Sequence, residues 1–392
     1  MRFIHKPATC LQPFRLIIII LLDKFVLMIR KIYLALLVSL IATSAALAQG
    51  QAGIHLTDTS LIKPASGTAN GYNTIDIHFN GFAFLDDHEY DALIPLRKTI
   101  SGTRTEIDMG YNVDTLNHFV VGVNPLHEFG GIPFYVQVNP VAYYSYTGQH
   151  WLYNMGEFPR DNLLPFPRAL LNDSVQYYRP FVEGGLLRNT NKFGTETAFI
   201  DWISRQTPTQ RNEFMAGEII KLAPNPGHAF YIAEYLLFEH DAGSKSDTAA
   251  PIQDQGGYQI RLGLDYSHRG YFDSLKFEAG YMFTEHRIRS EFSWQTSDGF
   301  VASVYISHKR ISIFDEFYKG DPNYLTFGDP FYSKTIYNRM DIMYTAFIGK
   351  HLKGQFFMDL HQSPSHLTDS EPGFRVVYDI GRKVIARFKD DH

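Results

Sequence analysis

Cysteine is almost absent from this sequence, because Cys10 is the only one among 392 residues. It lies in an N-terminal stretch with the features of a targeting segment, so the mature chain contains none. Disulfides, thiolate zinc sites and cysteine nucleophiles are therefore excluded. An exported protein without disulfides must be stabilised by packing or by a closed, hydrogen-bonded sheet.

Long apolar runs are missing beyond residue 48, so no later stretch qualifies as a transmembrane helix. Within residues 1–48, the basic start Met28–Lys31 precedes the apolar stretch Ile32–Ile41 and the small-residue cleavage site Ala46–Ala48. We predict a signal peptide that is cleaved near Ala48, with Met28 as the true start. The alternative is a membrane anchor over 16–29, but two charged residues interrupt its apolar run.

An excess of basic charge is also missing. Removing the leader takes away six of the 36 Lys and Arg residues and one of the 41 Asp and Glu residues, which leaves a net charge of −10. This balance argues against a nucleic-acid partner, which requires a basic face. Aromatic residues, in contrast, make up 15% of the chain. Such a content suits the aromatic girdles of a membrane β-barrel.

Alternation of side chains is the main structural signal. In 102–114, one parity carries Thr103, Thr105, Ile107, Met109, Tyr111 and Val113, and the other carries mainly charged residues. Alternate residues of a strand face opposite sides, so one face suits lipid and the other water. The pattern returns at 258–266, 275–283, 288–294 and 336–348. Two predicted strands, 101–115 and 335–349, span about 15 residues, whereas strands of globular proteins have a mode of about 5–6.

We therefore predict an all-β fold, a transmembrane antiparallel β-barrel of about 16 strands, within a range of 14 to 18. The expected domains are a leader over 1–48, a short N-terminal periplasmic arm over 49–70 and the barrel over 71–392. A soluble β-sandwich or β-helix is the rival architecture. Among the long connections, 159–175 either packs on the rim as an external loop, which we expect, or folds into the lumen as a short constricting helix.

The last predicted strand, 373–388, must pair with the first, because a sheet in hydrocarbon cannot keep an open edge. Its final aromatic, Phe388, resembles the C-terminal signal that barrel-assembly machinery reads. Two departures from that signal stand out: four residues follow Phe388, and Arg382 lies on the apolar parity, at an interface or a bulge.

Charged residues on the polar parity are the candidates for lining the lumen. In a hydrated channel, their field would tune the choice of solute. The alternative is a network of mutually satisfied ion pairs that fills a narrow lumen. The candidates are Arg104, Glu106, Asp108, Arg261, Asp265, Lys276, Glu278, Arg287, Arg289, Glu291, Arg339 and Asp341.

The segment 150–215 resembles Gram-negative porin-type proteins. The resemblance rests on the runs 151–160 (WLYNMGEFPR), 171–180 (LNDSVQYYRP) and 200–206 (IDWISRQ), followed by Arg211 and Glu213. The resemblance implies a passive diffusion channel or a secretion conduit, with no catalytic residues. A homotrimer is a possible oligomeric state, because porins are often trimers.

Enzyme chemistry finds weaker support. The composition of a barrel-protease site occurs in the run Asp86, Asp87, His88 and Glu89. Consecutive residues of a strand point apart, so we expect a solvated turn instead. Binding of Ca²⁺ through the carboxylates is the alternative. The pairs Ser267-His268 and Ser307-His308 also face opposite ways unless another strand completes them. No nucleophile elbow or metalloprotease helix motif is present.

We predict a porin-like channel in the outer membrane of a Gram-negative bacterium that passes small hydrophilic solutes, with no enzyme activity, no cofactor and no metal. Its expected partners are outer-membrane lipid, these solutes and barrel-assembly machinery. Two alternatives remain. A plugged or structural barrel would serve surface assembly or polysaccharide export, and a membrane-embedded hydrolase would show a Ser or carboxylate cluster near the extracellular rim.

Overall fold

The computed structural model describes residues 71–90, 98–223, 229–243, 251–364 and 366–388. The expected leader over 1–48, its cleavage site and the periplasmic arm over 49–70 lie outside these residues and stay predictions. Within the described part, no helix has both the length and the apolar character to cross a membrane.

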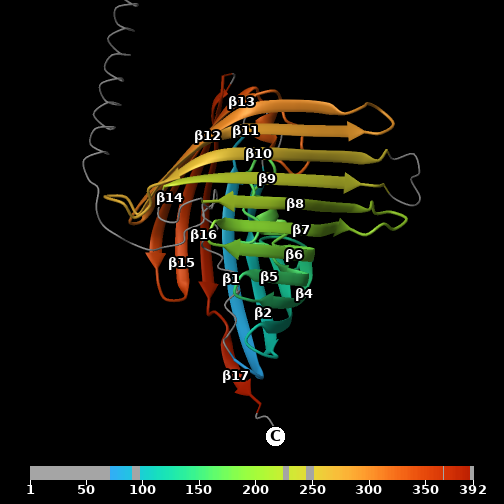
Figure 1. Cartoon of the computed structure of the whole chain (residues 1–392), viewed down its shortest axis with the longest axis vertical. Coiled ribbons are helices and arrows are strands. Elements are labelled where there is room, and N and C mark those ends of the chain that lie inside the picture. Colours follow the sequence, from blue (N-terminus) through green and yellow to red (C-terminus); the bar gives the residue numbers. More distant parts are fainter. Residues whose placement is uncertain (1–70, 91–97, 224–228, 244–250, 365, 389–392) are drawn as a thin grey trace, which may run out of the picture. The chain divides into compact units, whose positions relative to one another are not determined.

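The described residues form one antiparallel sheet in which each strand from β1 to β15 pairs with the next along the chain (Figure 1). The connections that follow odd-numbered strands are mostly longer than those that follow even-numbered strands. The strands are β1 (Thr74–His88), β2 (Lys98–Asn112), β3 (Asn117–Glu128), β4 (Gln137–Thr147), β5 (Trp151–Pro159), β6 (Phe181–Asn191), β7 (Gly194–Ser204), β8 (Glu213–Leu222), β9 (Phe230–Asp241), β10 (Gln253–Asp265), β11 (Ser274–Ile288), β12 (Gln295–His308), β13 (Ile311–Gly320), β14 (Ile336–Ile348), β15 (Leu352–Ser363), β16 (His366–Asp379) and β17 (Lys383–Arg387).

The sheet closes on itself because β1 pairs with β2 on one side and with both β16 and β17 on the other. Figure 1 shows β17 beside the start of β1. β16 and β17 act as one interrupted last strand, and Gly381, with a φ of 63°, lies at the interruption. The result is a closed barrel of 16 strand positions, which confirms the predicted fold class and strand number.

Arg382 occupies that interruption. Its guanidinium turns into the barrel, where Nη1 lies 2.8 Å from Asp76 Oδ1 and 2.7 Å from Asp108 Oδ1. The charge on the apolar parity therefore belongs to an inward bend of the last strand, and it ties this strand to β1 and β2.

The two faces of the wall follow the predicted alternation. On β1 the inward side chains Thr74, Asp76, His78 and Asn80 are buried. On β2 the outward Ile107 and Met109 are about half exposed. This outer band of large apolar side chains suits contact with lipid.

The segment 160–180 between β5 and β6, which includes the short helix α2 (Val175–Tyr178), fills the barrel interior. Phe166 packs against the inward Phe199 of β7 and Tyr235 of β9, and Leu170 is fully buried. The expectation of an external rim loop over 159–175 is therefore wrong. The run is too apolar to remain on the rim, because burying a Leu or Phe side chain gains about 1.5–3 kcal/mol.

The connection 321–335 between β13 and β14 also enters the interior. It carries the short 3-10 helix η2 (Pro330–Ser333), whose Phe331 and Tyr332 are buried. The segments 160–180 and 321–335, together called the plug below, touch each other through Asn323 Nδ2, which donates to the Ala169 carbonyl at 3.1 Å.

Candidate functional site

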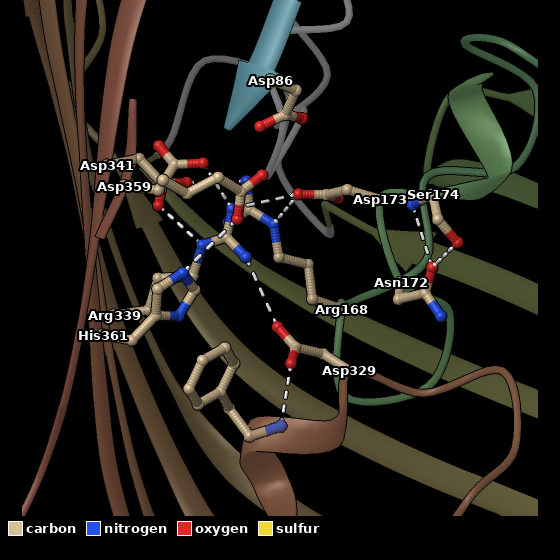
Figure 2. A network of polar contacts seen from close by, with 12 residues as sticks. Asp86, Arg168, Asn172, Asp173, Ser174, Asp329, Arg339, Asp341, Asp359 and His361 are labelled. Carbon is tan, nitrogen blue, oxygen red and sulfur yellow. Dashed lines mark hydrogen bonds and ion pairs between the residues drawn. The ribbon is translucent and has the colours of Figure 1, made fainter. Parts of the chain in front are cut away.

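An ion network fastens the plug to the wall, and Arg339 of β14 lies at its centre (Figure 2). Two of its contacts go to wall residues: Nη2 lies 2.6 Å from Asp359 and Nε 2.7 Å from Asp341. Two others go to the plug, at 3.1 Å to Asp173 and 3.4 Å to Asp329. The fully buried guanidinium thus joins two strands to both plug segments.

A second arginine, Arg168, repeats this connection from the plug side. Its Nη2 lies 2.6 Å from Asp341 of the wall, and its Nε lies 2.7 Å from Asp173 of the plug. Burial raises the pKa of the nearby Asp329 carboxyl, although the charge of Arg339 opposes the rise. With four carboxylates around two guanidinium groups, the network is acidic overall.

Most of the predicted lumen residues do face inward. Their described contacts go to other residues of the wall or of the plug. For example, Arg261 forms an ion pair with Glu278 at 3.1 Å, and Arg104 donates to the Tyr177 carbonyl at 2.6 Å. The inward candidates are Arg104, Glu106, Asp108, Arg261, Asp265, Lys276, Glu278, Arg339 and Asp341. Their charges fasten the filled interior instead of lining a described open path.

Three candidates do not line the lumen. Arg287 shares the outward parity of β11 and lies 2.7 Å from Asp254 of β10. Arg289 and Glu291 are exposed in the turn that follows Ile288. The alternation over 288–294 is a coincidence of composition, because β11 ends where that pattern begins.

The segment Asp86–Glu89 is not a solvated turn. Asp86 and His88 belong to β1, and because they are two residues apart they share its inward face. Asp86 is 1% exposed, and both side chains meet Glu371 of β16. The prediction of a solvated turn was wrong because it considered only that consecutive residues point apart, and not that residues two positions apart point the same way.

One stretch of the outer wall departs from the apolar band. Near the long-connection end of β2, the outward positions carry hydroxyl groups, and two residues further along the same face returns to Ile107. A row of hydroxyls on a lipid-facing strand is unusual, because such a face normally carries apolar residues. We call Thr99, Ser101, Thr103 and Thr105 the hydroxyl row.

His127 of β3 lies beside this row, directly opposite Thr103 in the strand pairing. Directly opposed residues of an antiparallel pair have Cβ atoms about 4.5–5.5 Å apart. The His127 Nδ1 atom is 2.5 Å from the Phe134 carbonyl oxygen. Since a carbonyl only accepts, Nδ1 carries the hydrogen, and the neutral ring presents Nε2 as a proton acceptor.

The surroundings leave the Thr103–His127 pair accessible. On the other side of Thr103, β1 places the small Ala83 opposite it, and Gly81 stands opposite Thr105. Towards the rim, Thr99 donates to Asp87 Oδ1 at 2.6 Å. The arrangement combines a hydroxyl, a histidine in the base tautomer and a carboxylate on one outer surface.

The connection 129–136 next to His127 exposes large apolar groups. Ile132 is 96% exposed, Phe134 62% and Phe129 57%. An exposed patch of this kind marks contact with a membrane or an apolar ligand. Because Phe134 also stacks on His127 at 4.0 Å, the apolar surface adjoins the candidate base.

A family model described as "Lipid A 3'-O-deacylase-type" matches residues 64–384. None of the curated proteins compared with the chain matches it. Among solved structures, an anion-selective porin from Comamonas acidovorans is 8% identical, covering 78% of this chain and 98% of that chain with a TM-score of 0.47. OccAB1 from Acinetobacter baumannii is 11% identical, covering 82% and 99% with a TM-score of 0.48.

The closed barrel with its apolar outer band, together with the family match, defines an outer-membrane β-barrel protein of Gram-negative bacteria. The chain belongs to the lipid A 3'-O-deacylase-type family. Two predictions are therefore wrong, namely that the protein is a passive solute channel and that it is not an enzyme. The family match indicates a hydrolase, the class kept as the second alternative.

Sequence reasoning missed the hydroxyl row because it counted Thr103 and Thr105 with the apolar parity. The signal was present in the sequence: four outward positions in succession carry Thr or Ser, while the following outward positions carry Ile, Met and Tyr. The role of His127 needed the register of β2 against β3, which the sequence does not give.

Proposed function

We propose that this protein hydrolyses an acyl ester of lipid A on its outer wall, at the hydroxyl row beside His127. The observation that carries the proposal is the pairing of Thr103 with His127 on the lipid-facing side of β2 and β3. The match to the deacylase-type family over residues 64–384 supports the substrate class.

The outer wall suits a membrane lipid better than the interior does. A lipid keeps its acyl chains in the hydrocarbon, and the plug leaves little room for such chains inside the barrel. Barrels of this kind have their long loops on the extracellular side. The hydroxyl row, near the long-connection end of β2, then lies at the level of the outer headgroups and their ester bonds.

The chemistry follows from the two side chains. His127 Nε2 takes the proton of the Thr103 hydroxyl, whose oxygen attacks the ester carbonyl carbon. The bond from that carbon to the sugar oxygen breaks, and the sugar oxygen receives the proton from His127. Water, activated by the same imidazole, then hydrolyses the acyl-threonine and releases the fatty acid.

Neighbouring groups would position the substrate. Asp87, Thr99 and Ser101 offer polar contacts towards the rim for the sugar headgroup. Phe129 and Ile132 offer an exposed apolar surface for the acyl chain that is to be removed.

The test is acyl release from purified lipid A by the folded barrel in detergent, followed by mass spectrometry. We expect His127→Gln and Thr103→Val to lower the rate by about 100-fold or more, the usual contribution of a general base. Thr103→Ser retains the hydroxyl and should keep measurable activity.

Thr105→Val is the matched control, because Thr105 is the next hydroxyl on the same face of β2 but has no described partner on β3. It should remain within a few-fold of the wild type. Full activity of His127→Gln would contradict the assignment of this site.

A further inference from the structure

A second group of chemically active side chains lies inside the barrel at its closing seam, away from the outer wall. Asp86 and His88 come from the end of β1, and Glu371 comes from β16, the strand that closes the barrel against β1. We call these three residues the seam cluster.

The ligand atoms of the seam cluster converge without bonding well to one another. His88 Nε2 lies 3.4 Å from Glu371 Oε1 and 3.6 Å from Asp86 Oδ1. Protein hydrogen bonds between nitrogen and oxygen usually measure 2.7–3.2 Å. Within the part of the chain that the structure describes, Asp86 Oδ1 and His88 Nε2 have no hydrogen-bond partner, and Asp86 is almost fully buried.

Two tyrosine hydroxyls orient the carboxylates of Asp86 and Glu371 through hydrogen bonds. Tyr177 donates to Asp86 Oδ2 at 2.7 Å, and Tyr90 donates to Glu371 Oε2 at 2.8 Å. The other oxygen of each carboxylate, Oδ1 or Oε1, faces His88. Such support around the ligands is typical of metal sites, where it fixes the orientation of the first shell.

The other histidine–carboxylate cluster of the interior provides a contrast. There, His78 bonds Asp108 at 3.0 Å and Asp379 at 3.1 Å, so both ring nitrogens have partners. Arg382 supplies a positive charge to the same Asp108 at 2.7 Å. The cluster His78, Glu106 and Asp108 therefore already has a guanidinium beside it, although Glu106 Oε1 and Asp108 Oδ1 have no hydrogen-bond partner among the described residues.

No arginine forms an ion pair with the seam cluster among the described contacts. The nearby Arg339 directs its donors to four aspartates, Asp173, Asp329, Asp341 and Asp359 (Figure 2). His361 Nε2 also lies 3.5 Å from Glu371 Oε2, so Glu371 meets two imidazoles, whereas Asp86 meets only His88 among the described ion pairs. A cation bound beside Asp86 would offset the cost of burying this carboxylate.

We propose that the seam cluster binds one divalent transition-metal cation through Asp86, His88 and Glu371. An imidazole with two carboxylates suits zinc and its neighbours, whereas calcium takes oxygen ligands. The ion joins the first strand of the barrel to the last and stabilises the closed seam. This role is independent of the hydrolysis proposed on the outer wall.

The test uses Zn²⁺ and the metal-free barrel, folded in detergent. We expect one bound Zn²⁺ per chain by elemental analysis, and a rise in resistance to urea when Zn²⁺ is added. Co²⁺ in place of Zn²⁺ should give visible d–d absorption bands, whose intensity reports the coordination geometry of the bound ion.

His88→Gln and Asp86→Asn should abolish both the binding and the urea effect. Tyr90→Phe should weaken binding by about 10- to 100-fold, as loss of a supporting hydrogen bond does. The matched control is His286→Gln, because His286 lies on β11, outside the seam cluster. It should bind as the wild type does, and native gel mobility verifies that each variant is folded.

Three results would overturn the proposal: no Zn²⁺ bound to a folded wild type, equal binding by folded His88→Gln, or binding of Ca²⁺ in preference to Zn²⁺. None of these results depends on lipid A hydrolysis, so failure here is distinguishable from failure of the proposed function.

Discussion

Replacing Arg339 by glutamine tests whether the ion network fastens the plug. Arg339 is 3% exposed and contacts four carboxylates at 2.6–3.4 Å. Removing one partner of a buried ion pair costs about 3–5 kcal/mol, because the remaining charges stay buried without compensation. A glutamine amide offers two donor hydrogens to four carboxylates, so we expect Arg339→Gln to lower the free energy of unfolding by about this amount.

The assay is urea unfolding in detergent, followed by tryptophan fluorescence. Arg289→Gln is the matched control, because Arg289 pairs with Asp254 but its side chain is 45% exposed. Exposed pairs contribute about 0–1 kcal/mol, so this variant should differ little from the wild type.

A double variant makes the test sharper. Asp359 is the nearest carboxylate to Arg339, and Arg339→Gln combined with Asp359→Asn removes one orphaned charge along with the arginine. The double variant should be more stable than the sum of its single variants predicts, by about 0.5–3 kcal/mol. If Arg339→Gln unfolds within about 0.5 kcal/mol of the wild type, the network is not what holds the plug.

Three further predictions concern the barrel interior. Burial raises the pKa of Asp329 above its unfolded value, so the folded state holds this proton more tightly, and stability falls as the pH rises through the raised pKa. Asp329→Asn should lose that part of the pH dependence in urea unfolding curves, and an unchanged dependence would contradict the assignment. Arg382→Gln leaves Asp76 and Asp108 without their guanidinium and should lower the free energy of unfolding by about 3–5 kcal/mol, whereas a loss under about 1 kcal/mol would argue against a role in closure. Leu170→Glu places an unpaired charge in the plug and should raise ion conductance in planar bilayers above that of a closed wild type; an open wild-type pore would refute the filled interior.

The sequence was sufficient to predict the barrel, because alternation is a local property of each strand. On β2, the side chains that the alternation predicts to face inward, from Arg104 to Asn112, do face the interior, and Ile107 and Met109 face outward as predicted. Strand number followed from chain length. The interruption of the last strand at Gly381 could not be predicted, since the residues on both sides of it continue the same apolar alternation.

The filled interior could not be predicted with the same ease. The apolar residues of 160–180 show that this segment must be buried somewhere, but whether it packs inside or on the rim depends on the space that the closed wall leaves. Partners such as Phe199 and Tyr235 come from distant strands.

The candidate sites depend on register, which sequence alone leaves open. Thr103 meets His127 only because β2 and β3 pair in the observed register, and a slip of one residue would turn one of them inward. Asp86 and His88 share a face by spacing alone, so two of the three residues of the seam cluster could be placed together from the sequence. Glu371 joins them through closure of the barrel.

The most direct test of the whole account measures acyl release and ion conductance on the same lipid vesicles containing the folded barrel and lipid A. We predict that the wild type releases fatty acid while the membrane stays electrically tight, and that His127→Gln stops only the release. Steady conductance without any fatty acid release would contradict it.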